Sequence, residues 1–196
     1  ALWRCVQETG ADAVGGKIER LWRCDPPRWY AEELGGALIS QDLGPVRKRW
    51  DRPTRHMVGA NIAFRREVFE RHGLFAEELG RRGERLLGGE DREMFLRLMH
   101  AGCPIVYEPA AIVWHKVDAE RLSKAYMRRW FWSIGQTLGH EMDWRWHHRL
   151  TAAPVWLWGR MLGSVARCAA AYLRPAAGEA ERFASEAWVR FHVGML

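Results

Sequence analysis

The sequence predicts an α/β fold, in which helices flank a mixed β-sheet and amphipathic helices follow toward the C-terminus. Three observations lead to this class. Short runs of strand type alternate with helical segments up to about residue 118. A helical stripe of apolar residues starts after the glycine pair 88–89. Beyond residue 118 the chain is helical in pattern, basic and rich in tryptophan. We therefore expect two regions, 1–118 and 119–196.

Glycine and proline divide the first region into short elements, because these residues punctuate helices and strands. Strands are predicted at 13–22, 37–40, 57–64, 104–107 and 111–114, and helices at 29–34, 66–72 and 90–101. The Pro26-Pro27 pair follows the first strand, and Gly73 ends the helix 66–72. Residues 45–56 and 76–89 are expected to be loops.

The helix predicted at 90–101 carries the most informative residues. Met94, Phe95 and Leu98 recur at helical spacing, so one face is buried. Glu90 and Asp91 stand in its first turn, where the helix dipole favours negative charge. A carboxylate held there beside a glycine-rich loop is well placed to act as a general base. The alternative is an ordinary acidic helix cap.

The second region is predicted to hold helices at about 119–139, 154–174 and 179–193. In the middle one, the apolar residues fall on one face and Arg160, Arg167 and Arg174 fall on the other. We expect residues 150–174 to lie flat on an anionic membrane, or the same apolar face to pack on the catalytic domain. The residues expected to insert are Val155, Trp158, Met161, Leu162, Val165 and Tyr172.

The net charge of +6 is unevenly distributed. Residues 121–174 hold nine basic and two acidic side chains, together with six of the twelve tryptophans. This combination suits an anionic membrane surface. Nucleic acid is a competing partner for such a segment, and a helical bundle with buried tryptophans is a third interpretation. The four cysteines form no Cys-x-x-Cys pair, which favours a reducing, cytoplasmic compartment.

Several motifs occur in a recognisable order. The segment Val58-Gly59-Ala60-Asn61 leads to Phe64-Arg65-Arg66, and Gly88-Gly89-Glu90-Asp91 leads to Arg97-Leu98. Tyr107-Glu108-Pro109 and then Trp114-His115 follow. In this order the motifs resemble the second half of a family 2 glycosyltransferase catalytic domain of the GT-A (nucleotide-diphospho-sugar transferase) type. The resemblance covers about residues 1–140 and implies a partial GT-A fold.

The resemblance implies an inverting transfer of sugar from a nucleotide-diphosphate sugar to the hydroxyl of a saccharide or lipid-linked acceptor. Asp91 corresponds to the catalytic base. Glu90 then positions the acceptor or orients Asp91, although Glu90 itself could be the base. His115 corresponds to a ligand of Mn²⁺ or Mg²⁺, which neutralises the leaving diphosphate. The residues expected to contact substrate are Gly59, Ala60, Asn61, Gly89 and Asp42.

One expected motif is missing. No two aspartates are separated by a single residue, so the Asp-x-Asp metal motif of this family is absent. We therefore expect the chain to be a C-terminal part of its enzyme and inactive by itself. Peripheral attachment at the cytoplasmic face of the membrane is expected, and nucleic acid is not expected as a partner. The alternative function is a non-enzymatic, basic, tryptophan-rich module that binds a membrane surface or nucleic acid.

Overall fold

The computed structural model describes residues 1–51, 56–77, 79–80, 88–141, 149–150 and 153–196. The chain divides into two compact units, described here one at a time. The first comprises Ala1–Leu21, Ile39–Gly80 and Gly89–Lys116. The described residues of the second lie in Trp22–Leu38, at Gly88 and in Val117–Leu196. Segment 22–38 thus belongs with the C-terminal helices. Most of the loop expected at 76–89 and two positions of the segment 150–174 lie outside the described residues.

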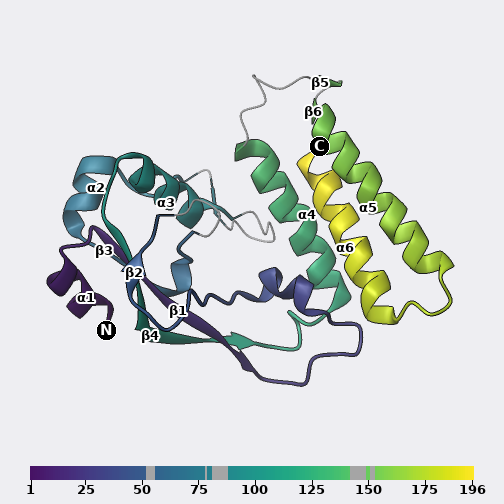
Figure 1. Cartoon of the computed structure of the whole chain (residues 1–196), viewed down its shortest axis with the longest axis horizontal. Helices are drawn as coiled ribbons and strands as arrows, with labels where there is room; N and C mark the ends of the chain where they lie inside the picture. Colours follow the sequence, from purple (N-terminus) through teal and green to yellow (C-terminus); the bar gives the residue numbers. More distant parts are fainter. Residues whose placement is uncertain (52–55, 78, 81–87, 142–148, 151–152) are drawn as a thin grey trace. The chain divides into compact units, whose positions relative to one another are not determined.

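A mixed four-stranded sheet organises the first part of the chain, in the order β2-β4-β1-β3 (Figure 1). Its strands are β1 (Ala13–Trp22), β2 (Lys48–Arg49), β3 (Ile62–Phe64) and β4 (Ile105–Val117). β3 runs antiparallel to β1, and β2 runs antiparallel to β4. Backbone hydrogen bonds from Asp12 to Pro104 and from Arg23 to Val117 indicate that β1 and β4 run in the same direction. The predicted α/β class with a mixed sheet is confirmed.

Three helices accompany this sheet in the first unit: α1 (Leu2–Thr9), α2 (Arg66–His72) and α3 (Glu90–His100). As predicted, α3 buries Met94, Phe95 and Leu98. The ring of Trp50 meets Phe95 and Tyr107 edge to face, with centroids 5.7 and 5.8 Å apart. These aromatic contacts join the buried face of α3 to strand β4 and fix the start of α3 relative to the sheet.

Several predicted elements differ from the structure. Residues 37–40 form no strand, because Ala37 and Leu38 belong to the 3₁₀ helix η1 (Glu32–Leu38), which also replaces the helix expected at 29–34. Only Ile62–Phe64 of the strand expected at 57–64 form a strand, β3, because η2 (Gly59–Asn61) precedes them. The two strands expected around Pro109 are one continuous strand, β4. Pro109 is tolerated because the partner β2 pairs only with Val106 and Tyr107, so no partner on that side needs its missing N–H.

The second unit is built mainly from α4 (Lys124–Glu141), α5 (Val155–Leu173) and α6 (Glu179–Met195), together with the short strands β5 (Arg149–Leu150) and β6 (Ala153–Pro154). α6 packs against both α4 and α5 (Figure 1). α4 and α6 lie so close together at Gly135 that a Cβ there would stand 2.2 Å from the Phe191 carbonyl oxygen. Arg128 adds a two-pronged ion pair with Glu186 at 2.8 and 3.0 Å.

Helix α5 packs by a narrow stripe of Leu157, Ser164 and Ala171. The apolar face predicted from the sequence lies on another side of the helix. Its side chains are partly or largely exposed, and the exposed fraction of Leu162 is 61%. Leu173, on the same side of the helix, is 82% exposed. Among the helices described, none combines the length and the apolar content that crossing a bilayer requires.

Candidate functional site

Asp91 lies in the first turn of α3, and backbone N–H groups hold both of its carboxylate oxygens. Oδ2 accepts the N–H of Gly59 at 2.9 Å, and Oδ1 accepts the N–H of Arg92 at 2.8 Å. The side chain is 18% exposed. Because each carboxylate oxygen can accept two hydrogen bonds, both still have capacity for a ligand. The carboxylate is therefore fixed in orientation, accessible and able to accept a further proton or hydrogen bond.

A residue that the sequence analysis missed stands next to Asp91. The Nε2 of His56 is 4.0 Å from Asp91 Oδ1. Burial lowers the pKa of His56, the Asp91 carboxylate opposes this shift, and the Arg92 charge adds to it. His56 is an isolated histidine in a basic segment, so no motif or spacing marked it beforehand.

Gly89 and Glu90 form the entry to α3. Gly89 adopts φ 116°, ψ −7°, a left-handed conformation that strains any residue with a Cβ. Glu90 presents a buried Oε2 that accepts no hydrogen bond from the residues described. Buried carboxylate oxygens normally have partners. Glu90 thus keeps an acceptor atom that no described residue uses.

Gly59 and Ala60 are exposed beside Asp91, whereas Asn61 is buried. The Asn61 amide nitrogen donates to the carbonyl oxygens of Lys17 and Ala111, at 2.8 Å each. Both amide hydrogens are therefore used to tie β1 to β4. A Cβ at Gly16 would lie 2.3 Å from this amide nitrogen and from the Ala111 oxygen, so the close approach requires glycine. Asn61 therefore offers no amide hydrogen to a ligand.

Asp42 lies in a separate group of polar residues. It accepts the N–H of Gly44 at 2.7 Å and the hydroxyl of Tyr107 at 3.3 Å, and its other oxygen is 3.3 Å from Lys17 Nζ. The Gly44 N–H and the Lys17 ammonium hold the pKa of Asp42 below its usual range, against the effect of desolvation. Both oxygens of the Asp42 carboxylate thus have partners within this group. None of these contacts joins Asp42 to Asp91.

His115 is partly buried near the end of β4. The described residues contain no group of three His, Cys, Asp or Glu side chains arranged to hold a metal ion. Within the described part of the chain, His115 therefore belongs to no cluster of three such ligands. Arg97 of the Arg97-Leu98 motif donates from its Nε to a Glu93 carboxylate oxygen at 2.9 Å.

Comparison with known proteins gives two relatives. The chain is 29% identical over its whole length to the succinoglycan biosynthesis protein ExoM of Rhizobium meliloti strain 1021, and spans 59% of that protein. It is 27% identical over 108 residues, 55% of its length, to the glucosyl-dolichyl phosphate glucuronosyltransferase of Haloferax volcanii, and spans 34% of it. No family model and no solved structure match the chain. The chain is thus similar to proteins of saccharide transfer and biosynthesis, and it spans less than two thirds of the length of each.

Proposed function

We propose that the protein containing this chain is an inverting family 2 glycosyltransferase of the GT-A type, with Asp91 as its general base. In the reaction, the Asp91 carboxylate takes the proton of an acceptor hydroxyl. The acceptor oxygen attacks the anomeric carbon of the donor sugar, and the bond from that carbon to the diphosphate oxygen breaks. A glycoside with inverted configuration and a nucleoside diphosphate are formed. One base without a nucleophile permits only this single displacement.

The geometry of Asp91 carries the proposal. Backbone N–H groups of Gly59 and Arg92 hold the carboxylate. Unlike side-chain donors, these groups cannot rotate away from it. A base whose position is set in advance loses little freedom when the acceptor binds. The exposed backbone of Gly59 and Ala60 leaves room for substrate beside it. The buried, unsatisfied Oε2 of Glu90 suits a second hydroxyl of the acceptor, which assigns Glu90 to positioning.

The proposal also includes a divalent metal ion, for which His115 is the proposed ligand. In the complete enzyme, Mn²⁺ or Mg²⁺ would supply positive charge to the leaving diphosphate, with His115 as one ligand. If so, His115→Ala raises the metal concentration needed for activity and leaves the fold intact. An unchanged metal dependence would show that His115 is structural.

The donor is a nucleotide-diphosphate sugar, and the acceptor is a saccharide or a lipid-linked saccharide. A lipid-linked acceptor is supported by the name of the Haloferax relative, which mentions a dolichyl phosphate. Peripheral contact with an anionic membrane at the cytoplasmic face also belongs to the proposal, because the apolar face of α5 is exposed. The same face would serve a non-enzymatic membrane-binding module, which is the second candidate.

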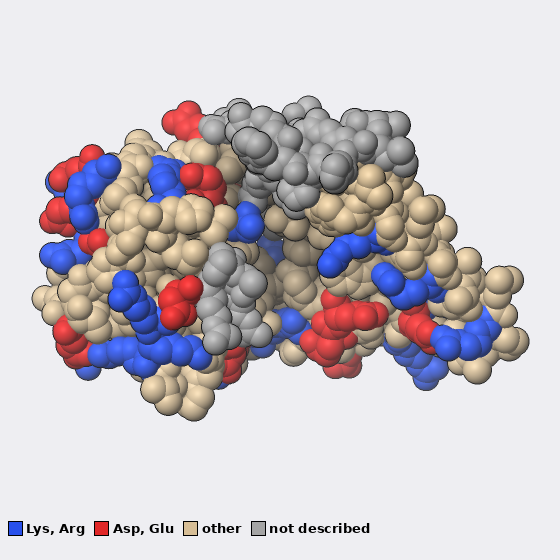
Figure 2. Space-filling model, turned by 45° about the horizontal axis from the view of Figure 1, so that its top comes forward, with Lys and Arg blue, Asp and Glu red and all other residues tan. Residues whose placement is uncertain are grey.

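Nucleic acid is not among the proposed partners. On the face drawn in Figure 2, the acidic and basic side chains of the described residues are interspersed. Nucleic-acid binding surfaces instead gather positive charge along one stripe or patch.

The experiment that tests the function uses the protein at its natural length. It is incubated with labelled nucleotide sugars and lipid-linked or free saccharide acceptors, and both the glycoside and the released nucleoside diphosphate are measured. Equal amounts of both products, with an inverted anomeric centre by NMR, support the proposal. A retained configuration contradicts the single displacement. Membrane binding by a folded protein that transfers no sugar from any donor favours the non-enzymatic module.

A further inference from the structure

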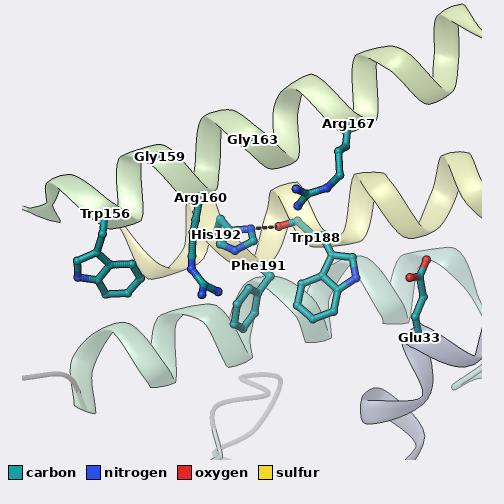
Figure 3. A pocket seen from close by; sticks show the side chains of 9 residues that line it. All are labelled: Glu33, Trp156, Gly159, Arg160, Gly163, Arg167, Trp188, Phe191 and His192. Carbon is teal, nitrogen blue, oxygen red and sulfur yellow. Dashed lines mark hydrogen bonds between the residues drawn. The ribbon is translucent and has the colours of Figure 1, made fainter.

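The second unit contains an open pocket that the proposed reaction does not use (Figure 3). Helix α5 contributes Arg160 and Arg167, and α6 contributes Trp188, Phe191 and His192. Gly159 and Gly163 lie in the same wall, and a Cβ on Gly159 would meet no atom within 4 Å. The backbone of α5 is therefore uncovered at Gly159, next to Arg160, and a Cβ on Gly163 would have the Arg167 guanidinium as its neighbour at 3.7 Å.

The two arginines carry the positive charge of the pocket. They are seven residues apart, so they stand on the same side of α5, about 10 Å apart along its axis. Neither forms an ion pair with any residue that the structure describes. Arg174, the next in the series, differs because it pairs with Glu181. The pocket thus presents two guanidinium groups that form no ion pair with a carboxylate of the described residues.

Aromatic rings and a histidine complete the site. Arg160 lies 5.9 Å above the ring of Trp156. The Nδ1 of His192 is 2.8 Å from the Trp188 carbonyl oxygen, which leaves Nε2 as the other polar atom of a buried ring. Burial lowers the pKa of His192, and the charges of Arg160 and Arg167 lower it further. An anion placed between the arginines would relieve this repulsion.

One carboxylate also lines the pocket. Glu33 comes from η1 and is exposed. In Figure 3 it stands at the opposite end of the pocket from Trp156, beyond Trp188. No ion pair links it to either arginine within the part of the chain that the structure describes. The end of the pocket beside Arg160 is therefore the more electropositive one.

The pocket opens beside the exposed apolar face of α5. With 3.6 residues per turn, Gly159 and Gly163 lie between the arginines and Leu162 on the helix surface. On the far side of Leu162 follow Val165 and Tyr172, both exposed. Helices that lie at a membrane surface place arginine and tryptophan next to exposed aliphatic residues. Their cations contact lipid phosphates, and their apolar side chains enter the acyl region.

We propose that Arg160 and Arg167 hold the phosphate of an anionic lipid head group in this pocket while the neighbouring apolar face of α5 enters the bilayer. This inference rests on the membrane contact proposed above and names the residues that recognise the lipid. It does not depend on the identity of the catalytic base. A guanidinium binds two phosphate oxygens at once, so the pair gives a specific contact as well as attraction at a distance.

The test measures binding of the full-length protein to vesicles of phosphatidylcholine with and without phosphatidylglycerol, at low salt. The variants are Arg160→Gln and Arg167→Gln, with Arg174→Gln as the control that removes the same charge from the end of the same helix. Loss of a general surface charge is expected to weaken binding about fivefold. Loss of a charged hydrogen bond is expected to weaken it about tenfold or more. Circular dichroism checks that each variant is folded.

The expected result is binding to the anionic vesicles only, with both pocket variants at least tenfold weaker and the control at most fivefold weaker. Equal losses in all three variants would overturn the proposal and leave a diffuse membrane contact in place. No binding to anionic vesicles would overturn both the lipid-phosphate pocket and the membrane contact. Sugar transfer to a soluble acceptor would still report separately on the enzyme. Free inorganic phosphate, added at constant ionic strength, distinguishes the sources. If it binds the pocket without vesicles and the variants bind vesicles like the wild type, the ligand is a soluble phosphate and the lipid assignment fails.

Discussion

The Oδ2 of Asp91 accepts the backbone N–H of Gly59 at 2.9 Å, although 32 residues separate the two in the sequence. This bond joins the start of α3 to the short helix η2. It gives the candidate base a fixed direction, and it explains why the glycine-containing segment and the acidic helix start belong to one site. A change at Gly59 should therefore affect catalysis through Asp91.

Gly59→Pro is predicted to lower kcat by tenfold or more while the protein stays folded. Proline removes the N–H and places its ring where Oδ2 now lies, so the carboxylate must move. The backbone accepts proline here, because Val58 is extended at φ −108°, ψ 131° and Gly59 begins the helical turn. Gly59→Ala is the control, since it keeps the N–H and its Cβ would stand 3.7 Å from Oδ2. Steady-state kinetics of both variants decide the matter, and equal kcat values would show that this hydrogen bond does not position the base.

Gly16→Ala is predicted to destabilise the fold by about 1–3 kcal/mol or more. Its Cβ would collide with the carbonyl oxygen of Ala111 and with the Asn61 amide, which together tie β1 to β4. Gly159→Ala is the matched control, because its Cβ meets no neighbour and alanine favours the helix by about 0.5–1 kcal/mol. Denaturant unfolding measures both changes. A stable Gly16→Ala variant would mean that the approach of the strands is looser than described.

Arg47→Met is predicted to lower the stability of the fold at pH 7. Arg47 pairs with buried Glu108 at 2.5 Å, and its 39% exposure places the cost below that of a fully buried pair. Burial by itself would raise the pKa of Glu108, but the Ala110 N–H and Arg47 outweigh it and lower that pKa. The lowered pKa stabilises the fold above the unfolded-state pKa of Glu108, and this contribution is lost as pH falls through the folded-state value.

Unfolding measured between pH 7 and pH 3 checks this prediction. The wild type should lose stability toward low pH more steeply than Arg47→Met. Arg47→Met combined with Glu108→Gln should recover part of the loss at pH 7, because no buried charge is left without a partner. The same pH slope in wild type and single variant would rule out this pair as a source of acid sensitivity.

Local patterns predicted the elements whose formation depends on local residues. The apolar spacing of α3 and the glycine after α2 were visible in the sequence, and both helices are present. Partners distant in sequence decided the other cases. Gln41 pairs with Ile18 as an isolated bridge, although a strand was expected just before it. The continuity of β4 through Pro109 depends on how short its neighbour β2 is, and periodicity does not contain that information.

The same distinction applies to the candidate site. Asp91 was proposed from its motif, and the hydrogen bonds that fix its carboxylate come from backbone atoms that no side-chain pattern marks. His56 was missed for the same reason, since only the fold brings it within 4.0 Å of Asp91. The hydrogen bonds from the Asn61 amide to the Lys17 and Ala111 carbonyl oxygens also depend on the fold. The pairing of Arg174 with Glu181, which sets it apart from Arg160 and Arg167, also depends on tertiary structure.

The central claim is that Asp91 removes the proton of the acceptor. The most direct measurement is single-turnover sugar transfer by the full-length Asp91→Asn protein, with Glu90→Gln as the comparison. Asparagine keeps one acceptor oxygen but turns an N–H group toward a backbone donor, so thermal unfolding must confirm that the variant is folded. The account predicts that Asp91→Asn slows transfer by about 10²–10⁴-fold while donor binding stays within a few-fold of the wild type. Transfer by Asp91→Asn within a few-fold of the wild type, or a larger loss in Glu90→Gln, would contradict it.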